Sequence, residues 1–244
     1  MQALNDNDLL RLWEQGRTMP IQHRAVAILV CGNPESTWDK LVELTVGERD
    51  RRLIRLRELT FGPSVNGLAL CRHCHEQMEL TLDTRELIQP VSVEKPSPVF
   101  VADMQSDITL RSPTTADLLT LDPGQSLDQA RRQLIRQCVV AGDKEDQGVR
   151  PQMLSDEVID ALPTQVPASD PMAEVYLDVR CPSCEKPSQV LFDIVQLLWA
   201  EIATAAKRLL WEIHHLARAY AWRESDILAM SSSRRQIYLE MVGV

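Results

Sequence analysis

Apolar and polar residues repeat with a helical period over the first sixty residues of the chain. The repeat predicts four helices separated by short turns, at residues 6–15, 21–31, 38–44 and 48–59. Gly16 follows the first of these segments and is typical of the end of a helix. Residues 1–62 are therefore expected to form a helical N-terminal region.

The fourth predicted helix is rich in arginine. Its apolar positions Leu53, Leu56 and Leu59 are expected to face inward. The opposite face is expected to project into solvent and carries Arg49, Arg51, Arg52, Arg55 and Arg57. These arginines could contact an acidic partner, but a solvated helix face is the simpler interpretation.

The period changes to two around a pair of Cys-x-x-Cys hooks, one formed by Cys71 and Cys74 and the other by Cys181 and Cys184. Apolar residues then occupy alternate positions, which is the pattern of a strand. The segments concerned are residues 66–70 and 78–82 around the first hook, and 175–180 and 189–191 around the second. A hook at the tip of each of two hairpins predicts a zinc ribbon in two halves, at residues 63–82 and 173–192.

The segment between the two halves, residues 83–172, is rich in proline and in short elements. Strands are predicted at residues 99–102 and 108–111. Ser126 with Gln129 forms a capping box for a helix that runs to residue 140, and Ser155 is expected to cap a short helix ending near residue 162. We expect a mixed α/β insertion that packs in part on the ribbon.

The last region, residues 193–244, contains the most regular pattern in the chain. Apolar residues at spacings of three and four predict one long amphipathic helix, at Ile194, Leu198, Ile202, Ala205, Leu209, Ile213, Leu216 and Tyr220. Trp199, Leu210 and Trp211 widen this face, so the helix is expected to pack on two sides, against the N-terminal helices or another protein. Two short helices are predicted to follow it, near residues 222–230 and 233–242. The whole chain is therefore expected to be an α+β protein.

Charge and composition restrict the possible functions. The 244-residue chain has a formal net charge of −9, and four thiolates with one Zn²⁺ would bring it to about −11. Such a charge repels phosphate backbones, so nucleic-acid binding is not expected. The sequence has no apolar run long enough for a membrane span. Asp6 and Asp8 interrupt any signal-peptide core, and a cytoplasmic location is expected.

The two hooks are the main candidates for chemistry. Four thiolates at this spacing predict one structural Zn²⁺ held by Cys71, Cys74, Cys181 and Cys184, with no open coordination position. His73 or His75 could replace one cysteine, although the pairing of the hooks favours four sulfurs. An iron–sulfur cluster is a further alternative. Disulfides within a hook would be strained, and disulfides between hooks would need an oxidising compartment.

The sequence contains no pattern that points to catalysis. The nearest is Glu212 with His215, which is half of the paired Glu-x-x-His arrangement of a di-iron site. Cys31 and Cys138 lie among aliphatic residues and are expected to be core thiols. The chain is therefore not expected to be an enzyme.

Several short motifs appear in a characteristic order along the chain. They are Leu44-Thr-Val-Gly-Glu-Arg-Asp50, the first hook, Leu110-Arg-Ser-Pro-Thr-Thr-Ala-Asp117, the second hook, Leu191-Phe-Asp193, Leu198-Trp-Ala-Glu201, His215-Leu-Ala-Arg-Ala-Tyr220, Trp222-Arg-Glu224, Asp226-Ile-Leu228 and Arg234-Arg-Gln-Ile-Tyr-Leu239. In this order the chain resembles the T-even phage family of baseplate hub assembly chaperones. Relatives of that family are encoded beside contractile phage tails and contractile injection systems.

The resemblance implies a non-enzymatic role in building or completing the hub at the end of the tail tube. It implies hub or spike proteins as partners, and the protein could stay in the tail particle. The family's metal ligands map onto the four hook cysteines, although Glu185 stands where a glycine commonly follows the last ribbon cysteine. The main alternative is a zinc-ribbon adaptor that binds nucleic acid or has a regulatory role.

We hypothesise that the C-terminal helices form or support the contact with the partner, because aromatic residues and arginine dominate interface hot spots. The candidates are Trp211, Tyr220, Trp222, Arg234, Arg235 and Tyr238. The competing interpretation is that these aromatic residues only close the protein's own core.

Overall fold

The computed structural model describes residues 1–88, 98–101, 106–140, 154–162 and 170–243. The helices are α1 (Asp6–Gly16), α2 (Ile21–Gly32), α3 (Trp38–Val42), α4 (Val46–Phe61), α5 (Thr84–Leu87), α6 (Thr115–Leu119), α7 (Leu127–Cys138), α8 (Asp156–Ala161), α9 (Ile194–Tyr220), α10 (Glu224–Leu228) and α11 (Ser232–Met241). The strands are β1 (Ser64–Leu70), β2 (Gln77–Asp83), β3 (Pro98–Val101), β4 (Ser106–Leu110), β5 (Val139–Val140), β6 (Tyr176–Arg180) and β7 (Pro187–Leu191). Helices and small antiparallel sheets are mixed, so the predicted α+β class is confirmed.

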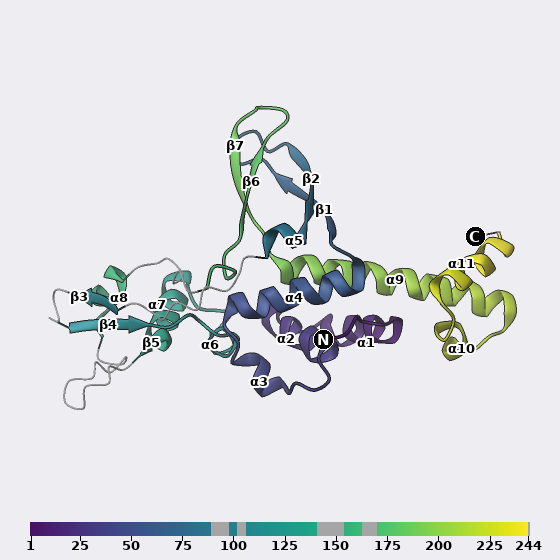
Figure 1. Ribbon diagram of the computed structural model, residues 1–244, viewed down its shortest axis with the longest axis horizontal. Coiled ribbons are helices and arrows are strands. Elements are labelled where there is room, and N and C mark those ends of the chain that lie inside the picture. The colour runs from purple at the N-terminus through teal and green to yellow at the C-terminus, as the bar shows by residue number, and fades with distance from the viewer. Residues whose placement is uncertain (89–97, 102–105, 141–153, 163–169, 244) are drawn as a thin grey trace.

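The long helix α9 is the spine of a helical layer (Figure 1). Helices α1, α2 and α4 pack along it, and α10 and α11 pack near its C-terminal end. Apolar residues at helical spacing are fully buried between these helices, among them Val26, Leu29, Leu53, Leu56, Leu198 and Ile202. Burial of these side chains supplies the main driving force for the layer, at about 1.5–3 kcal/mol for each large aliphatic side chain.

Helix α9 follows the predicted amphipathic pattern over all of its 27 residues. Asp193 caps its start by accepting a hydrogen bond from the backbone N–H of Gln196, and Ala221 ends it in a left-handed conformation. The expected packing on two sides is only partly correct. The Trp199 ring packs against Gly16 of α1 and under the Arg24 guanidinium of α2, whereas Leu210 and Trp211 are exposed.

The predicted orientation of the α4 arginines is wrong at two positions. Arg49 and Arg57 are buried, because Arg49 donates to Asp50 and Gln22 while Arg57 donates to Glu201 of α9. Leu59 is exposed instead of buried. The remaining arginines lie on the surface in ion pairs, Arg51 and Arg52 with Glu48 and Arg55 with Glu58.

The ribbon consists of two antiparallel hairpins, β1–β2 and β6–β7, that stand together away from the helical layer (Figure 1). Leu70 pairs with Gln77 next to the first hook, and Arg180 pairs with Pro187 next to the second. The strand boundaries agree with the predicted alternation, and each hook lies at a hairpin tip as expected.

The insertion has a small core of its own, formed by Val139, Leu154, Ile159 and Leu162. It lies at one end of the helical layer, where α6 packs on α2 and α3 (Figure 1). A bridge between Thr45 and Thr114 fixes this contact. Among the described elements of the predicted insertion, α5 packs on β2 of the ribbon, as expected for partial packing.

The chain returns from the insertion through a close contact with the start of α4. The Asp170 carboxylate accepts a hydrogen bond of 3.0 Å from the backbone N–H of Gly47. Burial of Asp170 raises the pKa of this carboxyl group. A Cβ atom at Gly47 would lie 2.0 Å from Asp170 Oδ1 and 2.8 Å from the backbone nitrogen of Ala173. Glycine is therefore needed at this position so that Asp170 can cap the helix.

Replacement of Gly47 by alanine is expected to destabilise the protein by about 2–4 kcal/mol, because the overlap displaces the buried Asp170 carboxylate from its hydrogen bond with the backbone N–H of residue 47. Urea unfolding followed by circular dichroism would measure this loss. Gly67→Ala is the matched control, since nothing lies within 4 Å of a Cβ at Gly67. Equal midpoints for the two variants would show that Asp170 does not restrict position 47.

Candidate metal centre

The two hooks meet in space although Cys74 and Cys181 are 107 positions apart. The four sulfur atoms all lie within 4.8 Å of one another. Cys71 Sγ is 3.7 Å from Cys184 Sγ, and Cys74 Sγ is 3.6 Å from Cys181 Sγ. A tetrahedron with metal–sulfur bonds of roughly 2.3 Å has sulfur–sulfur edges of roughly 3.8 Å. The four cysteines therefore form a group that could hold one metal ion.

The two hooks are built alike. In the first, the Cys71 N–H donates to Glu76 O and the His75 N–H donates to Cys71 O. The Cys181 N–H donates to Lys186 O in the second hook, where the Glu185 N–H donates to Cys181 O. His75 and Glu185 both have a φ of 59°, in the left-handed region. The turn is therefore made without the glycine that ribbons commonly have after the last cysteine, at a cost of order 1 kcal/mol for each residue.

The surroundings of the sulfurs resemble those of a closed centre. Cys71 and Cys181 are fully buried in a small apolar cluster with Met78, and Cys74 and Cys184 are more exposed. All four thiols are free, because their separations far exceed the roughly 2.05 Å of a disulfide bond.

The histidines beside the first hook do not join the sulfur group. His73 Nε2 lies 3.3 Å from the backbone carbonyl oxygen of Pro187. His75 occupies the left-handed turn position and is exposed. Among the described residues, the group with metal-ligand spacing contains four cysteines and neither histidine.

The two thiols of the first hook have pKa values that differ widely. Backbone N–H groups of Cys74 and His73 donate to Cys71 Sγ and lower the pKa of that thiol to about 6. The Glu76 N–H lowers the pKa of the Cys74 thiol. Burial and contacts with the other three sulfurs outweigh this effect and raise the pKa of Cys74 to about 12. A bound cation would oppose that increase, since a coordinating thiol is deprotonated.

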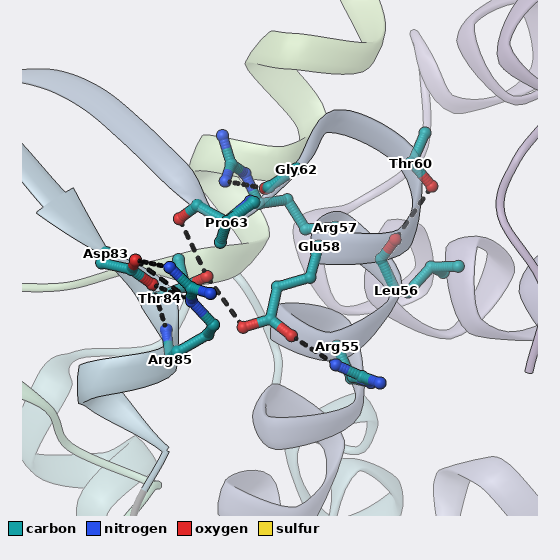
Figure 2. A network of polar contacts seen from close by, with 10 residues as sticks. All are labelled: Arg55, Leu56, Arg57, Glu58, Thr60, Gly62, Pro63, Asp83, Thr84 and Arg85. Carbon is teal, nitrogen blue, oxygen red and sulfur yellow. Dashed lines mark hydrogen bonds and ion pairs between the residues drawn. The ribbon is translucent and has the colours of Figure 1, made fainter.

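A polar network fixes the root of the first hairpin to α4 (Figure 2). The Arg57 guanidinium donates to the carbonyl oxygens of Gly62 and Ser64, and it pairs with Glu201 of α9. Where the second strand of the hairpin ends at the same root, the Thr84 hydroxyl donates to Glu58 (Figure 2). Both strands of the hairpin are thus held at the helical layer, while the cysteines hold its tip against the second hairpin.

The proposed partner-binding residues are either exposed, half-buried or, in the case of Arg235, fully buried. Trp211 and Arg234 are exposed. Tyr220 and Trp222 stack with ring centroids 4.4 Å apart, and Tyr238 meets Trp222 edge-on at 4.9 Å. These three rings are half-buried against the main core, so they contribute to the protein's own packing.

Arg235 differs from the others because it is 1% exposed and cannot reach a partner from this position. Its guanidinium pairs with Glu212 at 2.8 Å and Asp6 at 2.7 Å, and it donates to the carbonyl oxygen of Met230. Arg235 therefore supports the C-terminal helices from inside. In the sequence, the feature that indicates this network is Glu212, a single acidic residue on the apolar face of a predicted helix.

The two remaining cysteines are not candidates for nucleophiles. Cys138 is buried, as predicted, and burial raises its pKa to about 11. Cys31 is only partly buried, and its Sγ lies 3.2 Å from the Arg11 guanidinium. Burial is the main cause of the raised pKa of Cys31. Neither thiol is activated by its surroundings.

The fold and the site define a protein in which a helical layer carries a four-cysteine ribbon. A family model described as T4 bacteriophage base plate protein matches residues 31–199, from α2 to α9. The chain belongs to this family of phage baseplate proteins, so the predicted relationship is confirmed, and other baseplate proteins are its expected contacts. No curated protein and no solved structure matches the chain. None of the helices in the described ranges is long and apolar enough to cross a membrane.

Proposed function

We propose that the protein is a non-enzymatic factor that assembles, or forms part of, the baseplate hub of a contractile tail or contractile injection system. It acts through contacts with hub or spike proteins in the cytoplasm of the bacterium or infected host cell, before or during incorporation into the tail. The single observation that carries this proposal is the family match, which spans both hooks and the insertion. Cys31 and Cys138 lie outside the hook group and both have a raised pKa, which is consistent with a non-enzymatic role.

We further propose that the four hook cysteines hold one structural Zn²⁺. Four sulfur donors at near-tetrahedral separations leave no position for a substrate or a reactive water. The ion would therefore supply stability and a fixed relation between the two hairpins. The acidic net charge of −9 makes the alternative of a nucleic-acid adaptor less favourable.

The contact with the hub is expected to use the surface near the C-terminal helices. Purified hub and spike proteins from the same tail gene cluster, tested one at a time by calorimetry, should include at least one that binds the chain. Arg234→Ala is expected to weaken this binding by about 5- to 30-fold, because exposed arginines are frequent hot spots. Trp222→Ala should weaken it as well.

Lys40→Ala is the control for Arg234→Ala, since Lys40 is an exposed cation on α3 at a distance from the C-terminal helices. Thermal melting would establish that each variant is folded, which matters most for the half-buried Trp222. Failure of every hub and spike protein to bind the wild-type chain would refute the proposed function. Unchanged binding by folded Arg234→Ala and Trp222→Ala variants would exclude this surface.

A further inference from the structure

The charges of α9 are divided between its two faces. The helix contains two carboxylates: Glu201 pairs with Arg57 of α4, and Glu212 pairs with Arg235 of α11 and with Arg208 on α9 itself. Its cations, in contrast, all lie on the exposed side. The inward face therefore uses every negative charge of the helix, and the outward face is left without one.

The outward face carries a continuous stripe of five exposed residues, at spacings of three and four positions, which we call the α9 stripe: Lys207, Leu210, Trp211, His214 and Arg218. Residues at these spacings lie on one side of a helix. Lys207 and Arg218 form no ion pair with any residue in the described part of the chain. The stripe thus has an apolar centre with a cation at each end, about 16 Å apart at 1.5 Å per residue.

Trp211 is the prominent side chain of the α9 stripe. It is 45% exposed, and neighbouring Leu210 is 37% exposed. The His215 ring lies against the indole, with centroids 4.4 Å apart, and restricts its orientation. A large apolar side chain that is already held in place loses little entropy when it enters a pocket. Exposed tryptophan of this kind is typical of an interface anchor.

The charge of the stripe indicates the chemistry of its partner. A face with cations and no carboxylate contrasts with the net charge of −9 of the whole chain. It is complementary to an apolar pocket with carboxylates at its rim. Two unpaired cations are too few for firm binding to a phosphate backbone on a chain of this charge.

We propose that the α9 stripe docks a baseplate protein that presents an apolar pocket for Trp211 between acidic rim groups facing Lys207 and Arg218. This inference rests on the proposed function, because it takes the occupant from the hub and spike proteins. It adds the chemistry of the contact and places it on α9. Charge attraction at the rim would speed the encounter, and the indole would hold the complex together.

The test uses the hub or spike protein that binds the wild-type chain, with affinity measured at low and at high salt. Trp211→Ala is expected to raise the Kd by about 30-fold or more. The double variant Lys207→Glu/Arg218→Glu is expected to raise it by about 10-fold or more at low salt and to remove most of the salt dependence. All three positions are exposed, so the melting temperatures of these variants should equal that of the wild type.

Matched controls separate a local contact from a general effect. Leu127→Ala removes a side chain that is 89% exposed on α7, and Lys40→Glu reverses an exposed charge on α3. Both should bind as the wild type does. Binding by the wild type that survives Trp211→Ala and the charge reversals would overturn this inference and leave the proposed function standing.

Two other outcomes would also overturn the inference. Sedimentation could show that the wild-type chain self-associates through Trp211, in which case the stripe joins two copies of this chain. A duplex DNA fragment could bind with a steep salt dependence that Lys207→Glu/Arg218→Glu abolishes, which would assign the stripe to nucleic acid. If no hub or spike protein binds the wild type, the proposed function fails and this inference fails with it.

Discussion

Replacement of Cys181 by serine is expected to abolish tight metal binding and to unfold the ribbon. Cys181 is buried between the hairpins, and its sulfur lies 3.6 Å from that of Cys74. Structural zinc contributes roughly 10 to 16 kcal/mol of apparent binding energy in finger peptides at neutral pH. Because the ribbon's apolar cluster is small, we expect loss of the ion to release both hairpins and to loosen the attachment of the insertion, while the helical core remains folded.

Metal content of the purified protein and hydrogen exchange across β1, β2, β6 and β7 would measure this effect. The wild type should contain one ion for each chain, and its cobalt-substituted form should show the spectrum of a four-sulfur site. Cys31→Ser is the control, because Cys31 lies on α2, outside the hook group. Wild-type metal content and melting curve in Cys181→Ser would contradict both the proposed ligand set and its structural role.

Replacement of Arg235 by methionine is expected to destabilise the protein by about 3–5 kcal/mol, because it leaves buried Glu212 without its main partner. The same change removes the ion pair with Asp6 of α1 and the hydrogen bond to Met230. Helix α11 should therefore separate from α9 and α1 at lower denaturant concentrations than the rest of the helical layer unfolds.

Urea unfolding and limited proteolysis between α9 and α11 would detect this change. Arg234→Met is the matched control, since Arg234 is the exposed neighbour, and its effect should stay within about 0.5 kcal/mol. The double variant Arg235→Met/Glu212→Leu should recover much of the loss, because it also removes the buried carboxylate, which exposed Arg208 alone would otherwise pair. Equal midpoints for Arg235→Met and Arg234→Met would show that the buried pair does not stabilise the C-terminal helices.

Features with a regular local pattern could be predicted from the sequence. The span of α9 followed from its apolar spacing, and the ribbon strands followed from alternation next to the hooks. The convergence of the four cysteines was also predicted, because thiolate ligands at this spacing restrict where the two hooks can lie. In these cases the residues that determine the structure are close together in the sequence or share a demanding chemistry.

Features that depend on a distant partner could not be predicted in this way. Arg57 and Arg235 are buried because Glu201, Glu212 and Asp6 approach them from other helices, and a helical pattern alone assigns such arginines to solvent. The need for glycine at position 47 likewise arises from Asp170, 123 positions away. Short helices such as α5 and α6 cannot be predicted from periodicity, because four or five residues show too little of a period.

The position of α9 as the spine of the helical layer has a consequence for synthesis of the protein on the ribosome. Helices α1, α2 and α4 bury their apolar faces against a helix that is made only after residue 193. At about 5–20 residues per second, the interval between completion of α4 and completion of α9 is roughly 10 to 30 s. During that interval the nascent N-terminal helices expose apolar surface, and prematurely terminated chains that end before α9 would be substrates for cellular quality control.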